Sequence, residues 1–297
     1  MTEPKAISSQ NLSPAARLLL RGLDNRWERY ENCFQICCQE FSKEAVHDLR
    51  VTTRRLLNII EIFERLFLGT KGRKLRQDLK EQLDNLDQLM DTQVQIAFVV
   101  DEMAEVEGVS VFLKYLSRRE AKLLKDVEKL VQSLSIVTQK RWLNNFRSNA
   151  EARLQIPDVR TCLISAVDNS YAYVLQRFSR IDPQKTETIH RTRIAFKSFR
   201  YAVEVIHPLI VRYPVELLKI MNGYQGYMGD IQDIEVLQGM LKAFGKKHAK
   251  VDTSSSIAFV DERHRLLLET FLSHMDTLND FWRYSPRQSY PWNKART

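Results

Sequence analysis

The sequence predicts an all-α protein, and two observations support this prediction. Prolines and glycines are scarce, with 8 and 9 among 297 residues, and no proline lies between Pro14 and Pro157. A β protein of this length needs many more turn residues. Apolar residues also recur at helical spacing, as at Leu75, Leu79 and Leu83. With 44% hydrophobic residues the chain can also bury a sizeable core.

Capping signals place the ends of the expected helices. Ser13 followed by Pro14 begins the first, because serine is a favoured N-cap and proline fits the first helical position. Ser42 caps the second, which runs to about residue 68 and stops at Gly69. Further helices are expected at about 72–104, 109–133 and 138–153, from 157, and at about 182–207, 214–244 and 253–283. The helix at 214–244 is expected to be interrupted around Gly223, Gly226 and Gly229, where two helices would approach closely.

The sequence also contains an internal repeat. Residues 46–63 (VHDLRVTTRRLLNIIEIF) match residues 189–206 (IHRTRIAFKSFRYAVEVI), and residues 86–94 match residues 228–236. The chain is therefore expected to be a duplicated bundle with about four helices per half and pseudo-twofold symmetry. We place this body at residues 12–283, with halves at about 12–135 and 136–283. Flexible tails are expected at 1–11 and 284–297.

Each copy of the repeat carries a basic stripe on one helix face, at about 100° per residue. The stripes consist of His47, Arg50, Arg54 and Glu61 in the first copy and His190, Arg193, Lys197, Arg200 and Glu204 in the second. Residues 47–80 have a net charge of +5 and residues 190–219 of +4, against +8 for the whole chain. Like charges on one helix face repel each other, so such a stripe needs a reason. A bound polyanion is the simplest one. Arginine suits phosphate because its planar fork binds two oxygens.

A solvated surface is the alternative interpretation of these stripes. The repetition, the preference for arginine and the histidine at the same end of both stripes argue against it. We expect the two stripes to face each other and to line one basic trough.

These segments resemble the two signature helices of the CHAD family, the conserved histidine α-helical domain. The segments that contain Asp91 and Asp233 resemble the Leu-Gly-x-x-x-Asp stretches of that family. The resemblance covers about residues 12–283. It implies two four-helix bundles around a basic central cavity. It also implies binding of inorganic polyphosphate, and in some members association with polyphosphate granules.

The resemblance further implies the residues of the site. The anion-binding positions of the family correspond to His47, Arg50, Arg54, Arg55, His190, Arg193, Lys197 and Arg200. Supporting positions are Asp91, Asp233, Glu61 and Glu204, and a wider surface is expected from Tyr201, Arg17, Arg21, Lys80, Arg118, Arg119 and Lys219.

Some positions depart from the family pattern. Leu57 and Ser198 stand where a basic residue is usual. In the first half Asp87, Met90 and Gln93 replace the usual Gly, Arg and Asp, whereas the second half keeps Gly229 and Asp230. We therefore expect the second half to be the stronger anion site.

Two other functions stay open. Glu44 with His47, and Glu187 with His190, form the Glu-x-x-His pattern of di-metal helical-bundle enzymes, although the cations on the same face disfavour a metal there. A pI near 9.3 also fits a protein that binds the phosphate backbone of nucleic acids. No helix-turn-helix, zinc or aromatic stacking motif is visible in the sequence.

We expect a non-enzymatic protein without a cofactor, because no nucleophile, general base or metal cluster is evident. The N-terminal residues lack an apolar signal core, and no apolar run is long enough for a membrane span, so a cytoplasmic location without a membrane partner is expected. Four cysteines, Cys33, Cys37, Cys38 and Cys162, are expected to be reduced and mostly buried.

Overall fold

The computed structural model describes residues 12–67 and 69–293, which fold into helices. The α-helices are α1 (Pro14–Gln39), α2 (Lys43–Leu66), α3 (Arg73–Glu102), α4 (Val109–Ser133), α5 (Ile136–Arg153), α6 (Val159–Phe178), α7 (Thr186–Ile206), α8 (Glu216–Lys247) and α9 (Ser254–Ser273). Short 3₁₀ helices are η2 (His207–Leu209), η3 (Met275–Asp280) and η4 (Pro291–Asn293). Within the described ranges, β pairing is limited to an isolated bridge between Asp182 and Lys185. The expected fold class is confirmed.

The two predicted serine caps are confirmed. The Ser13 hydroxyl accepts a hydrogen bond from the Ala16 N–H at 3.2 Å, and Ser42 accepts one from the Ala45 N–H at 3.1 Å. Each bond satisfies a backbone donor that the first helical turn leaves without a partner. The turn after α2 contains Gly69, whose φ of 83° is a left-handed conformation that suits glycine.

The predicted interruption around Gly223, Gly226 and Gly229 is wrong, because α8 is continuous from Glu216 to Lys247. A Cβ atom on Gly223 or Gly226 would meet nothing within 4 Å, so neither glycine serves a close approach of helices. Helix propensity is a weak preference that tertiary packing overrides. Here α8 is held by an apolar face that includes the buried Met221 and Met228.

The end of the chain is also more folded than predicted. The last α-helix ends at Ser273, not near Arg283, and the buried Trp282 beyond it donates from Nε1 to Asp168 at 2.8 Å. The rings of Tyr290 and Trp292 pack against Trp282, with centroids 5.0 and 6.0 Å away. Residues 284–293, expected in a flexible tail, therefore belong to the folded body because their aromatic rings bury apolar surface. The other expected tail residues, 1–11 and 294–297, lie outside the described residues.

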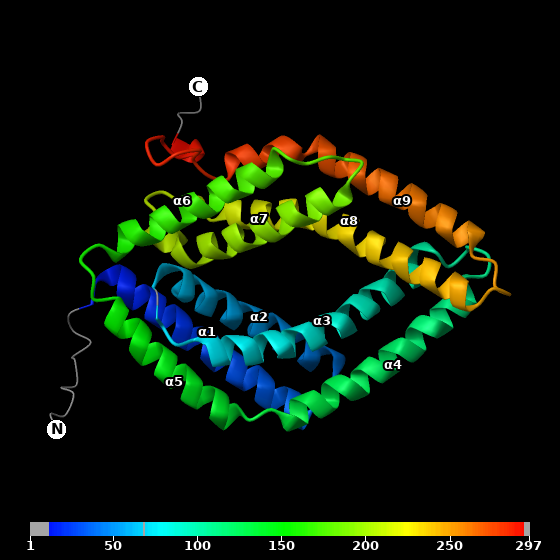
Figure 1. The fold of residues 1–297 in the computed structure, drawn as a ribbon, viewed down its shortest axis with the longest axis horizontal. Coiled ribbons are helices and arrows are strands. Elements are labelled where there is room, and N and C mark those ends of the chain that lie inside the picture. Colours follow the sequence, from blue (N-terminus) through cyan, green and yellow to red (C-terminus); the bar gives the residue numbers. More distant parts are fainter. Residues whose placement is uncertain (1–11, 68, 294–297) are drawn as a thin grey trace.

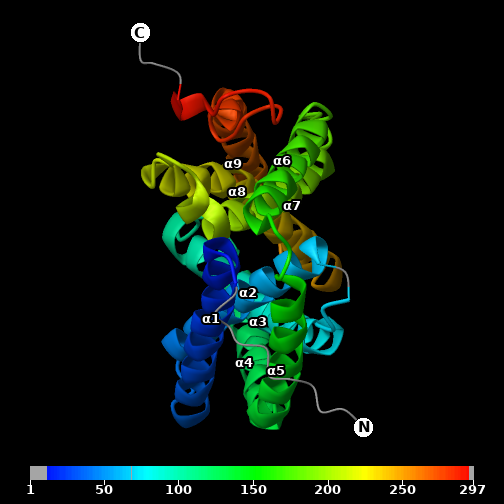
Figure 2. The same ribbon diagram turned by 90° about the vertical axis from the view of Figure 1, so that its left-hand side faces the viewer.

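The two halves repeat one order of helix packing. In the first half α1 contacts α2, α2 contacts α3 and α3 contacts α4, and the helices α6 to α9 repeat this succession. Figure 1 shows α1 to α5 as a lower layer and α6 to α9 as an upper layer, and Figure 2 shows the same two layers from one end. The repeated helices α2 and α7 contact each other between the layers.

Helix α5 belongs to the first half, although the predicted boundary assigned it to the second. It contacts α1 and α3. The ring of its Phe146 lies edge-on to Phe63 of α2, with centroids 5.6 Å apart. Its buried Gln139 accepts a hydrogen bond from the Tyr30 hydroxyl at 2.8 Å. The sequence repeat has no counterpart for α5, so tertiary packing alone determines its place.

Two apolar clusters hold the layers together. The larger one contains buried residues of every helix from α1 to α9. The smaller one joins the far ends of α3 and α4 to α8 and α9, through residues such as Phe112, Leu241 and Val260. These ends meet at the right of Figure 1. Along α3 and α8, Asp91 and Asp233 lie between the residues of the larger cluster and those of the smaller one.

Candidate functional site

The basic stripes of α2 and α7 come together at the contact between these helices. Burial and the positive charges of Arg54, Arg193 and Arg50 lower the pKa of Lys197 to about 7, and Asp87 only partly opposes this. These five residues with Asp91 and Asp233 are called the central cluster below. The structure thus brings together two predicted residues from each stripe, and it adds carboxylates among them.

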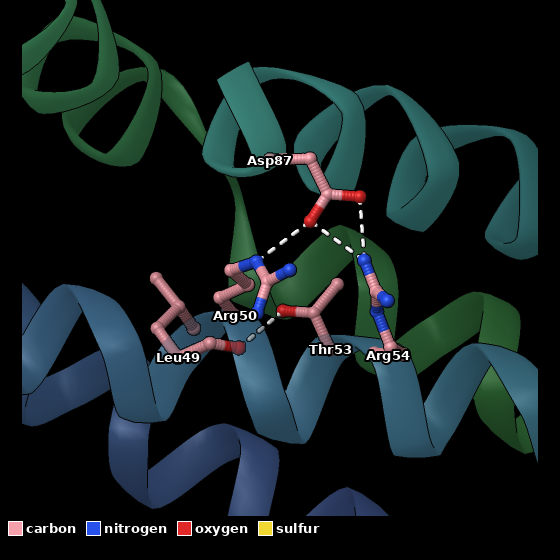
Figure 3. Close-up of polar contacts among 5 residues, drawn as sticks. All are labelled: Leu49, Arg50, Thr53, Arg54 and Asp87. Carbon is pink, nitrogen blue, oxygen red and sulfur yellow. Dashed lines mark hydrogen bonds and ion pairs between the residues drawn. The ribbon is translucent and has the colours of Figure 1, made fainter. Parts of the chain in front are cut away.

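Asp87 of α3 binds both arginines of the first stripe (Figure 3). Its Oδ1 accepts a hydrogen bond from Arg50 Nε at 2.6 Å, and Arg54 Nη2 lies 2.7 Å from Oδ1 and 2.5 Å from Oδ2. The three side chains are 18–29% exposed. Thr53, between the two arginines in sequence, points its hydroxyl to the Leu49 carbonyl at 2.7 Å. Arg50 and Arg54 are one helical turn apart, so one carboxylate can bridge them.

The aspartates Asp91 and Asp233 lie close to the arginines of the central cluster. Burial raises the pKa of Asp91, and the nearby Asp87 adds to the effect, while Arg50, Arg54 and Arg193 oppose it. Burial likewise raises the pKa of Asp233 against the attraction of Arg193, and Asp91 adds repulsion. Gln95 of α3 donates to the Asp233 carbonyl at 2.8 Å and ties α3 to α8 at this point.

Both stripes keep buried polar atoms without hydrogen-bond partners among the described residues, Arg54 Nε in the first and two atoms in the second. Arg193 Nε and His190 Nδ1 are both buried in this state. A Cβ atom on Gly229 of α8 would lie 3.7 Å from Arg193 Nε, so the guanidinium packs beside a glycine. Buried polar groups without partners are rare in proteins, and an incoming anion would satisfy Arg193.

Arg200 is engaged within the protein. Its guanidinium donates from Nε to Gln225 at 2.9 Å, pairs with Glu204, and lies 4.4 Å from the centroid of the Tyr201 ring. Arg200 is buried. Three of the predicted residues therefore form a separate contact set with α8, at the far end of the second stripe.

Arg55 faces a groove along α1 that the sequence did not reveal. A pocket of about 300 Å³ is lined by Arg55 with Arg26, Arg29 and Glu204, and an adjoining one of about 400 Å³ adds Arg17 and Arg21. Burial lowers the pKa of Arg26, with Arg55 and Arg29 adding to the effect and Glu204 opposing it. The sequence did not indicate Arg26 and Arg29, because the four arginines and three carboxylates of α1 leave little net charge.

Part of the positive charge counted for the first stripe lies elsewhere. Lys71, Arg73 and Lys74 line a separate pocket of about 630 Å³ together with Arg141 of α5. The net charge of residues 47–80 therefore divides among the central cluster, the groove on α1 and this pocket.

The remaining predicted residues lie at the surface. His47, Lys80, Arg118 and Lys219 are exposed, and so is Arg119, whose Nε lies 3.4 Å from the Thr92 hydroxyl. Glu61 pairs with Arg65 at 3.8 Å. Of the two predicted Glu-x-x-His carboxylates, Glu44 is exposed and Glu187 pairs with Arg191 at 2.8 Å. Within the described ranges, no three His, Cys, Asp or Glu side chains form a set of metal ligands.

The four cysteines are unpaired, and they are less buried than predicted. Cys37 is buried and Cys33 half-buried, whereas Cys38 and Cys162 are exposed. Along the described chain, the helices are too short or too polar to span a bilayer.

Comparison with known sequences decides the family. A profile of the CHAD domain matches residues 17–242, which is most of the chain. The chain belongs to the CHAD family. The resemblance drawn from the two histidine helices is thus confirmed, and the matched range contains the whole central cluster of this CHAD domain.

Solved structures share the fold of this CHAD domain. The crystal structure of the CHAD domain from the plant Ricinus communis has a TM-score of 0.64 and 18% identity, with 94% of each chain covered. PptA from Streptomyces chartreusis has a TM-score of 0.59 and 15% identity, with 91% of this chain and 99% of the other covered. A search of curated proteins gave no match.

Proposed function

We propose that this protein binds inorganic polyphosphate in the trough between α2 and α7. The observation that carries the proposal is that Arg50 and Arg54 of α2 lie close to Arg193 and Lys197 of α7, where these charges and burial together lower the pKa of Lys197 to about 7. Burial and neighbouring cations both disfavour the charged ammonium of a lysine, and an anion beside it relieves both effects. A chain of phosphates supplies the missing negative charge, and the family resemblance implies the same ligand.

The predicted binding mode is charge-assisted hydrogen bonding from Arg and Lys to the non-bridging oxygens. Arg193 supports this mode because its buried Nε has no partner among the described residues. Affinity is expected to fall steeply with salt, since several phosphates are neutralised together. Longer chains are expected to bind better than a triphosphate because linked groups engage successive side chains.

The decisive test compares the wild type with Arg54→Ala/Lys197→Ala, which removes one cation from each half. We expect tight binding of long-chain polyphosphate by the wild type and at least a tenfold loss in the double variant. Loss of one charge-assisted contact costs about 1.5–3 kcal/mol, and tenfold corresponds to about 1.4 kcal/mol. Lys125→Ala/Lys246→Ala is the matched control, because it also removes one cation from each half and both of these lysines are exposed and lie outside the predicted site.

Competitors and a product assay separate the alternatives. Duplex DNA that displaces polyphosphate at equal phosphate concentration would favour a nucleic-acid binder. The proposal is binding without turnover, so no orthophosphate should appear in the same samples. Release of orthophosphate that disappears in His47 or His190 variants would contradict it. Equal binding by the double variant and the wild type would overturn the proposed site.

A further inference from the structure

The arginines of the two stripes have different partners. In the first half one carboxylate, Asp87, lies within 2.5–2.7 Å of nitrogens from both Arg50 and Arg54. The position equivalent to Asp87 in the internal repeat is Gly229, because residues 86–94 match residues 228–236. Gly229 lies beside Arg193, which is the repeat equivalent of Arg50.

A carboxylate that bridges two guanidinium groups occupies the position that a phosphate would take. It presents two oxygens to Arg50 and Arg54, as two non-bridging phosphate oxygens would. The pair is also shielded from water, since Arg50 and Arg54 are only 19% and 18% exposed. A phosphate that binds these arginines must therefore displace Asp87 or accept repulsion from it.

We propose that Asp87 competes with the ligand for Arg50 and Arg54. It thereby directs phosphate to Arg193 and Lys197 in the second half of the trough. This inference rests on the proposed polyphosphate binding. It makes Asp87 the residue that determines how many phosphates the trough contacts and how tightly it holds the chain. The other charges that face this pair are Arg193 and Lys197 from α7, Asp91 from α3 and Asp233 from α8.

The test exchanges the two equivalent positions. Asp87→Gly and Asp87→Asn both remove the carboxylate, and the second keeps the size of the side chain. Both variants should bind long-chain polyphosphate about tenfold more tightly than the wild type at low salt. The slope of log affinity against log salt should become steeper by about 0.7 for each additional phosphate contacted.

The reciprocal variant is Gly229→Asp. A Cβ atom there meets Arg193 only at ordinary contact distance, 3.7 Å, so the substitution places a carboxylate beside this guanidinium. This variant should bind polyphosphate more weakly than the wild type, and Asp87→Gly/Gly229→Asp should return the affinity toward that of the wild type.

The control for a general charge effect is Asp101→Asn. Asp101 is exposed and lies on the same helix, about 20 Å along it at about 1.5 Å rise per residue. It should leave the affinity and the salt slope unchanged. A purely structural Asp87 would give variants that unfold at lower temperature and bind equally or more weakly, and that result would overturn the inference. Absence of binding by the wild type and by every variant would instead overturn the proposed function.

Discussion

Lys197 is the residue whose charge responds most directly to pH in the proposed site. Its neighbours are Arg54 and Arg50 of α2, Arg193 of its own helix and Asp87 of α3. With a folded pKa of about 7 against an unfolded value near 10.5, the unfolded chain binds the proton more strongly between these values. The contribution of Lys197 to stability is therefore unfavourable at low pH, and it improves as pH rises from about 7 to 10.5.

Ligand binding should show the opposite trend. Phosphate stabilises the charged ammonium, so the complex takes up a proton above pH 7. We expect the affinity for long-chain polyphosphate to fall between pH 7 and 9, by up to about tenfold per pH unit. Titration calorimetry in buffers of different ionisation enthalpy measures the proton uptake directly.

Lys197→Arg provides the control, because arginine stays charged in this range. The dependence above pH 7 should disappear in this variant. An unchanged slope above pH 7 would exclude Lys197 as its source.

The residues of the two stripes could be predicted because their spacing is a local property of one helix. Arg50 and Arg54, like Arg193 and Lys197, follow directly from the repeated pattern. The pairing of Asp87 with two arginines depends on how α3 packs against α2, which no local pattern contains. Sequence reasoning recognised Asp87 as a departure and missed its partners.

At the scale of elements, the caps were predictable and the glycines of α8 were not. Ser13 and Ser42 act within one turn of their own helix. The effect of Gly223 depends on the whole length of α8, because packing elsewhere on the helix offsets a weak local preference. The assignment of α5 to the first half likewise depends on tertiary contacts such as that of Phe146 with Phe63.

Gly223→Ala should therefore stabilise the protein. Gly223 is exposed in the interior of α8, and a Cβ atom there would meet nothing within 4 Å. Replacing such a glycine by alanine gains about 0.5–1 kcal/mol, which is about 1–4 °C in Tm for a protein of this size. Thermal unfolding followed by circular dichroism measures the change.

Gly72→Ala is the contrasting variant. A Cβ atom at Gly72 would lie 2.8 Å from a Glu64 carboxylate oxygen and 2.9 Å from the Phe146 ring. It should lower the Tm, because the ring is part of the core. A decrease in Tm for Gly223→Ala would show that α8 is not continuous at this position.

At the scale of the whole molecule, the smaller apolar cluster joins the two layers at the end away from α5. The buried Phe244 of α8 packs against Phe112 and Tyr115 of α4, with ring centroids 5.3 Å from each. Phe244→Ala should lower the free energy of unfolding by about 3–5 kcal/mol, through lost burial and the cavity left behind. Urea denaturation measures it, with Val137→Ala, whose side chain is 77% exposed, as the control. A loss below about 1 kcal/mol would mean that this end contributes little to the fold.

The position of Asp91 and Asp233 between the two apolar clusters has a consequence for evolution. The apolar packing that stabilises the fold lies on either side of these two aspartates. Substitutions in the polar region around them therefore change its charge and leave the two apolar clusters in place. Duplication then supplied two copies of the same scaffold whose charges can diverge independently. In the proposed role of Asp87, an exchange as small as glycine for aspartate at equivalent positions would give the two copies different tasks.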